Sequence, residues 1–119
     1  ASLAREALEK ALAVEWSSSL AGLYGELPAM EPAALAAEAR LRIERAERWL
    51  LEHGGDAPLL AALGRLCVRA ELWGKAESYL ETSLRFDETR ATHLELARLL
   101  DRLDRGAEAQ PHYRRAAEL

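Results

Sequence analysis

The chain has one cysteine among its 119 residues, Cys67, so an internal disulfide is excluded and the cellular compartment is left open. Cys67 falls on the apolar face of an expected helix. No neighbour in the sequence would lower the pKa of its thiol, as a nucleophile requires. We therefore interpret Cys67 as a small buried hydrophobic residue.

Long apolar runs and an excess of positive charge are also absent. No window approaches the ~18 to 20 apolar residues of a membrane span, and no signal peptide opens the chain. The 16 Lys and Arg residues stand against 20 Asp and Glu, for a net charge of -4. Nucleic-acid binding requires a basic stripe. We expect a soluble region that binds no nucleic acid.

The motifs that carry catalysis are missing as well. No nucleophile stands beside a base, and no metal-ligand cluster or phosphate loop is present. The serine run 17–19 is interpreted as a helix N-terminus. His53, next to Gly54 and Gly55, is expected to interact with the last carbonyls of its helix. We expect no enzyme, no catalytic residue, no metal and no cofactor.

Helix-forming residues are abundant. Ala, Leu, Glu and Arg dominate, and apolar residues recur at spacings of three and four, which is the period of a helix. Glycine and proline interrupt the pattern too often for a continuous coiled coil. The sequence predicts an all-α chain in a single domain.

One helix-turn-helix unit occurs twice, 33 residues apart. In each copy a small residue follows a leucine, a second small residue opens the next helix, and a large residue follows four positions later. Small residues let two helices approach, and large ones fill the layer between pairs. The period predicts an α-solenoid and resembles the tetratricopeptide repeat. The positions are Leu63, Gly64, Ala76 and Leu80, then Leu96, Ala97, Ala109 and Tyr113.

The pattern divides the chain into a partial repeat at about 1–15, a divergent repeat at 18–53, and repeats at 56–87 and 89–119. Asp56 and Thr89 are expected N-caps, and Gly54-Gly55 is expected to form a left-handed C-cap. The prolines at 28 and 32 break the divergent repeat. Pro111 predicts a kink or a late start of the last helix. Both chain ends lie within helices, so we expect a fragment of a longer protein, with end helices that could pair two copies.

Arginines form a ladder in the two clear repeats. Two lie one turn apart on the first helix of one repeat, and two recur at the equivalent places of the next: Arg65, Arg69, Arg98 and Arg102. First helices of tetratricopeptide repeats line a concave groove, so the resemblance implies that the ladder faces a partner. Guanidinium groups suit the carboxylates of an acidic peptide, a C-terminus or a tetrapyrrole. The alternative is a set of surface charges paired with Glu71, Glu95 or Asp101.

Family members that capture chaperone tails use a carboxylate clamp of Lys and Asn. The corresponding face here has Ala61, Arg65 and Glu95, so that clamp is not reproduced.

Several phrases together resemble the C-terminal region of the HemY family, a haem-biosynthesis-associated tetratricopeptide protein of proteobacteria. The resemblance spans nearly the whole chain and depends on the order and spacing of its elements. These are Glu15-Trp16, Leu23-Tyr24-Gly25, Ala46-Glu47-Arg48-Trp49-Leu50, Leu63-Gly64-Arg65-Leu66-Cys67 and Leu72-Trp73-Gly74-Lys75-Ala76.

The resemblance implies an inner-membrane parent protein whose two N-terminal spans are missing here, with this region on the cytoplasmic face. The family is linked to late haem synthesis and is thought to organise enzymes there. We predict a non-enzymatic scaffold that binds a protein or peptide, with Trp49 and Trp73 as packing residues and the role of Trp16 left open. The rival hypothesis is a tetrapyrrole carrier or sensor with His93 or His112 as ligand, and a purely structural, stacking role also remains open.

Overall fold

The computed structural model describes residues 2–14, 16–25 and 35–119. Within these residues the secondary structure consists of helices without a strand, so the all-α class is confirmed there. The helices are α1 (Ser2–Val14), α2 (Ser18–Tyr24), α3 (Leu35–Leu50), α4 (Ala57–Arg69), α5 (Trp73–Phe86), α6 (Arg90–Arg102) and α7 (Gly106–Glu118).

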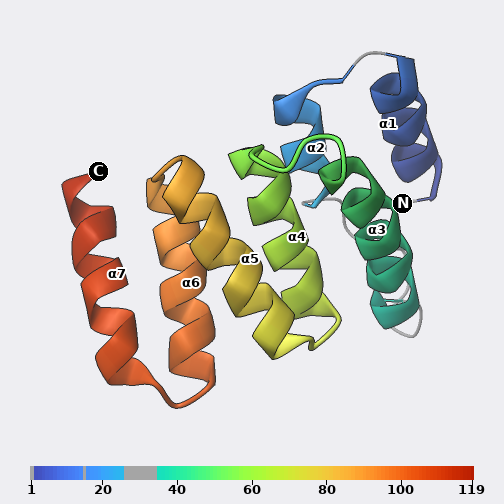
Figure 1. The fold of residues 1–119 in the computed structure, drawn as a ribbon. Coiled ribbons are helices and arrows are strands. Elements are labelled where there is room, and N and C mark those ends of the chain that lie inside the picture. Colours follow the sequence, from blue (N-terminus) through green and yellow to red (C-terminus); the bar gives the residue numbers. More distant parts are fainter. Residues whose placement is uncertain (1, 15, 26–34) are drawn as a thin grey trace.

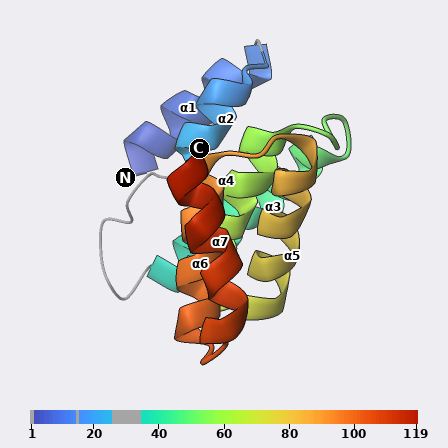
Figure 2. The ribbon, with the colours of Figure 1, turned by 90° about the vertical axis from the view of Figure 1, so that its left-hand side faces the viewer.

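From α3 to α7 the helices follow one another across the molecule, and α1 and α2 lie at the α3 end, with α2 beside α4 (Figure 1). The pairs α4/α5 and α6/α7 are antiparallel hairpins, and α5 packs against α6. Helix α4 also packs against α2, α3 and α6. Viewed along the array, α4 and α6 lie on one side and α5 on the other (Figure 2). The helices α2, α4 and α6 therefore form a row.

Side-chain caps set the starts of three helices. Asp56 accepts a hydrogen bond from the backbone N–H of Leu59 at 3.0 Å, and Thr89 accepts one from Thr92 at 3.2 Å. Both predicted N-caps are confirmed. Ser17 caps α2 in the same way, at 3.3 Å from the nitrogen of Leu20, which confirms the interpretation of the serine run. Each contact satisfies a backbone donor that has no partner within its helix.

The first helix of each clear repeat ends in the same motif. Glu71 and Asp104, 33 positions apart, have φ values of 59° and 62°. The next residue, Leu72 or Arg105, donates its backbone N–H to a carbonyl five positions back, at 2.8 Å in both cases. This is a Schellman motif with a non-glycine residue in the left-handed position. The repeat seen in the sequence thus extends to the backbone of its turns.

Two expectations about helix ends are wrong. No glycine in the described residues has a positive φ, so Gly54 and Gly55 do not form a left-handed cap. Instead α3 ends at Leu50, and the turn after it closes through bonds such as His53 N–H to the Trp49 carbonyl, at 3.0 Å. The divergent junction with its two prolines lies outside the described residues.

Pro111 does not delay the last helix, which begins at Gly106 and includes the proline. The predicted late start is wrong. Proline removes the bond to the carbonyl four residues earlier, which belongs to Ala107. Both Ala107 and Pro111 are exposed, so water can satisfy that carbonyl.

The repeat positions occupy the core. All except the half-buried Tyr113 are buried. At Gly64 the fit is closest, because a Cβ atom there would stand 2.5 Å from Cδ2 of Leu80. The small residue lets α4 and α5 approach, and Leu80 fills the space against it.

Candidate functional site

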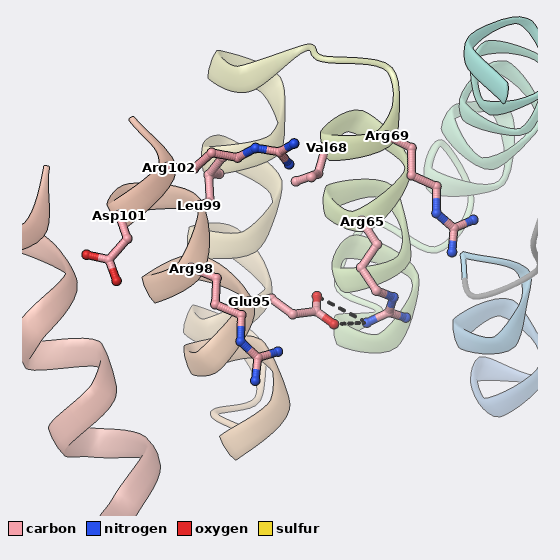
Figure 3. A pocket seen from close by; sticks show the side chains of 8 residues that line it. All are labelled: Arg65, Val68, Arg69, Glu95, Arg98, Leu99, Asp101 and Arg102. Atoms are coloured by element: carbon pink, nitrogen blue, oxygen red, sulfur yellow. Dashed lines mark hydrogen bonds and ion pairs between the residues drawn. The ribbon is translucent and has the colours of Figure 1, made fainter. Parts of the chain in front are cut away.

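A groove of about 700 Å³ lies between α4 and α6, the first helices of the two clear repeats. All four arginines of the predicted ladder line it (Figure 3). The other lining residues are Val68, Glu95, Leu99 and Asp101. A smaller cavity of about 240 Å³, at the starts of α4 and α6, shares Arg65 with this groove. The structure therefore brings the ladder together on one face of the helix row.

Arg65 is held by contacts on both sides. Its Nη1 lies 3.3 Å from Oε1 and 3.4 Å from Oε2 of Glu95 on α6, and its Nη2 donates to the carbonyl of Gly22 on α2 at 2.9 Å. One guanidinium thus links three successive helices of the row. The pairing with Glu95 is the surface-charge alternative considered for the ladder, and for Arg65 it is the observed arrangement.

The other three arginines differ from Arg65 and from one another. The guanidinium carbon of Arg102 lies 5.1 Å from the ring centre of Trp73, a cation–π contact. Arg98 is exposed. The head group of Arg69 is turned away from α6, toward the N-terminal helices (Figure 3). Arg98 is therefore the member of the ladder best placed to meet a ligand from solvent.

Val68 and Leu99 give the groove an apolar part that the sequence analysis did not identify. Val68 is half-buried and Leu99 is buried, and they come from α4 and α6 respectively. The sequence does contain a signal for this apolar part, because Val68 follows Arg65 by three positions and therefore lies on the same face of the helix. An apolar strip beside guanidinium groups suits a ligand with both carboxylates and apolar side chains.

The charge of the groove is positive although the whole chain is negative. Four arginines and two acids line it, which gives 4 - 2 = +2, against -4 for the chain. Asp101 is turned toward α7 and accepts a hydrogen bond from the Tyr113 hydroxyl at 2.7 Å (Figure 3). This bond, with a smaller contribution from burial, raises the pKa of Tyr113. Of the two acids, Glu95 is thus the one seen in contact with an arginine of the ladder.

The two histidines of the rival hypothesis meet between α6 and α7. Their Nδ1 atoms lie 3.0 Å apart, and Nε2 of His93 lies 2.8 Å from Oε1 of Glu88. Arg115 holds the same carboxylate at 2.7 and 2.9 Å. Neither His93 nor His112 lines the groove that the ladder arginines line.

Sequence reasoning missed a cluster around Trp16. Its indole N–H donates to Asp56 at 3.1 Å, Ser18 donates to the same carboxylate, and its ring stacks on His53 with ring centres 3.9 Å apart. Trp49 meets it edge-on. The ring of His53 thus packs on an aromatic ring, while the expected contact with the last carbonyls of α3 is made by its backbone N–H, which donates to Trp49. Trp16 and Trp49 are packing residues here.

Cys67 is fully buried, and burial raises the pKa of its thiol to about 11. No group of three or more potential ligands occurs among the described side chains. No described helix has both the length and the apolar character needed to cross a bilayer.

Comparison with family models, curated proteins and solved structures finds no match for this chain.

Proposed function

We propose that this chain is a non-catalytic interaction module, a tetratricopeptide-like solenoid whose α4/α6 groove binds an acidic, partly apolar segment of a partner protein. The repeat of 33 residues, its recurrence in the Schellman turns at Glu71 and Asp104, and the row formed by α2, α4 and α6 support the solenoid. The observation that carries the function is the gathering of all four ladder arginines in one groove.

Binding energy in such a groove has two sources. Burial of ligand side chains against Val68 and Leu99 contributes the hydrophobic part. Hydrogen bonds from guanidinium to carboxylate contribute about 1.5–3 kcal/mol each where they form. Electrostatic attraction also makes association faster and dependent on salt.

The test uses a short labelled peptide with leucines on one helical face and glutamates beside them, and a matched peptide with glutamine for glutamate. Fluorescence anisotropy should show binding of the glutamate peptide that weakens as salt is raised, and much weaker binding of the glutamine peptide. Arg98→Glu should reduce affinity for the glutamate peptide about tenfold or more.

Arg114→Glu is the matched control, because Arg114 is an exposed arginine on α7 that does not line the groove. Its affinity for the glutamate peptide should stay close to that of the wild type. Equal loss in both variants would mean that only net charge matters. Equal affinity for both peptides would refute the acidic-ligand proposal.

We further propose a cellular location and a class of partner for this module. The ordered phrases around Trp16, Trp49 and Trp73 resemble HemY, and they support a partner among enzymes of haem synthesis at the inner membrane of a proteobacterium. Capture from a proteobacterial membrane extract, read by mass spectrometry, should enrich such enzymes on the wild type and not on Arg98→Glu. Recovery of the same proteins by both would count against the groove as their site.

A further inference from the structure

Glu95 places a carboxylate of the chain itself against the arginine ladder. It comes from α6, the same helix as Arg98 and Arg102, and reaches across the groove to Arg65 on α4 (Figure 3). Both partners are partly accessible, with 20% of the Arg65 side chain and 25% of the Glu95 side chain exposed. A carboxylate from a partner that approached Arg65 would therefore meet a position that the Glu95 carboxylate already occupies.

The hydrogen-bonding geometry of the Arg65–Glu95 ion pair is less favourable than that of the Arg105–Glu77 ion pair. A single nitrogen of Arg65 meets both oxygens of Glu95, at 3.3 and 3.4 Å. Between Arg105 and Glu77, by contrast, two nitrogens meet two oxygens at 2.7 and 3.0 Å. Short contacts from two nitrogens are the strong form of this interaction. The closest contact of Arg65 is instead to the Gly22 carbonyl, at 2.9 Å.

We propose that Glu95 is an internal competitor for the groove, occupying Arg65 in place of the partner's carboxylate until the partner displaces it. This inference rests on the proposed function and specifies its regulation. Arg65 can keep its bond to Gly22 while it exchanges one carboxylate for another, so the row of helices stays linked.

The competition also sets which ligands bind well. A ligand with one carboxylate gains an ion pair at Arg65 but breaks one, so its net gain is small. A ligand with two carboxylates, one at Arg65 and one at exposed Arg98, gains a contact that Glu95 does not supply. The groove should therefore select segments with paired acidic residues over those with a single one.

The experiment measures the affinity of the labelled glutamate peptide for Glu95→Gln and for Asp101→Asn. Both variants remove one negative charge from the groove lining, but Asp101 bonds to Tyr113 rather than to an arginine of the ladder. Glu95→Gln should tighten binding about three- to tenfold, and Asp101→Asn less than twofold. In an Arg65→Gln background, the Glu95→Gln gain should disappear, because the contested group is gone.

The outcomes separate this inference from the proposed function. Binding of the glutamate peptide by the wild type, with no greater gain in Glu95→Gln than in Asp101→Asn, overturns the competitor and leaves the groove as the site. No binding by the wild type or Glu95→Gln overturns both. A loss of stability in Glu95→Gln, measured by urea denaturation, together with unchanged affinity identifies Glu95 as a structural link only.

Discussion

At the scale of single residues, Gly64 shows how a small side chain decides the distance between two helices. A Cβ added there would stand 2.5 Å from Cδ2 and 2.6 Å from Cγ of Leu80, which is fully buried. At Gly74, on the neighbouring helix, an added Cβ meets nothing within 4 Å. A side chain added at Gly64 would therefore clash with the neighbouring helix, whereas one added at Gly74 would not.

Gly64→Ala should lower the free energy of unfolding by about 1–3 kcal/mol, because it overpacks the α4/α5 interface. Gly74→Ala, the matched control, should leave stability unchanged or raise it by up to about 1 kcal/mol, since alanine favours helix. Urea denaturation measures both. A Gly64→Ala protein as stable as the wild type would show that α4 and α5 can separate at little cost.

At the scale of helices, α7 is joined to α6 by a polar line of Arg115, Glu88, His93 and His112. Nδ1 of His93 faces Nδ1 of His112 at 3.0 Å, and the ring centres are 5.2 Å apart, so both nitrogens lie near the line between the rings. One proton between them forms a hydrogen bond. Two protons there repel each other, so the contact tolerates only one.

The predicted consequence is acid sensitivity of the α6/α7 pair. Burial, and then the charge of His93, lowers the pKa of His112 below its ordinary value of 6.5. The folded chain therefore binds fewer protons at His112 than the unfolded chain, and its stability should fall as pH drops below about 6.5. His112→Gln should flatten this part of the stability profile, measured by denaturation between pH 7.5 and about 5. An unchanged slope would contradict the assignment.

A second loss of stability, at lower pH, is expected from Glu88. Hydrogen bonds from Arg115, and then from His93, lower the pKa of its carboxyl to about 2. This stabilisation is present above the usual carboxyl range and is lost as pH falls toward 2. The different windows allow the contributions of His112 and Glu88 to be measured separately.

At the scale of the whole molecule, α4 is the central element. It packs against α2, α3, α5 and α6, and nine of its residues are buried. An array of helix pairs held by neighbour contacts depends most on the element that has the most neighbours. Helix α1, by contrast, packs against α2 and is linked to α3 by the ion pair of Glu9 with Arg45.

Leu63→Ala, in the middle of α4, should lower the free energy of unfolding by about 2–5 kcal/mol. Leu51→Ala, at a position 87% exposed, should change it by less than about 0.5 kcal/mol. Hydrogen exchange should show faster opening in α3, α5 and α6 together in the Leu63→Ala protein. Loss of protection confined to α4 would mean that the helix pairs unfold independently.

Local chemistry accounts for what the sequence determined by itself. Helical class, the N-caps at Asp56 and Thr89, the burial of Cys67 and the equivalence of Arg65 and Arg98 all follow from residue type and spacing within a helix or a repeat. The same reasoning was wrong about a left-handed cap at Gly54-Gly55 and about a late start of α7 caused by Pro111. Residue propensity indicates which backbone conformations a residue can adopt. The hydrogen bonds formed by neighbouring residues decide which of these conformations is observed.

Only the tertiary structure decided which groups meet. The link from Arg65 to Gly22 and Glu95 joins residues 43 and 30 positions apart, and no pattern within one helix specifies it. The same holds for the groove with its apolar residues and for the contact between His93 and His112. Distances between helices depend on how whole surfaces pack, so the four arginines of the ladder acquired different surroundings only when α2, α4 and α6 came side by side.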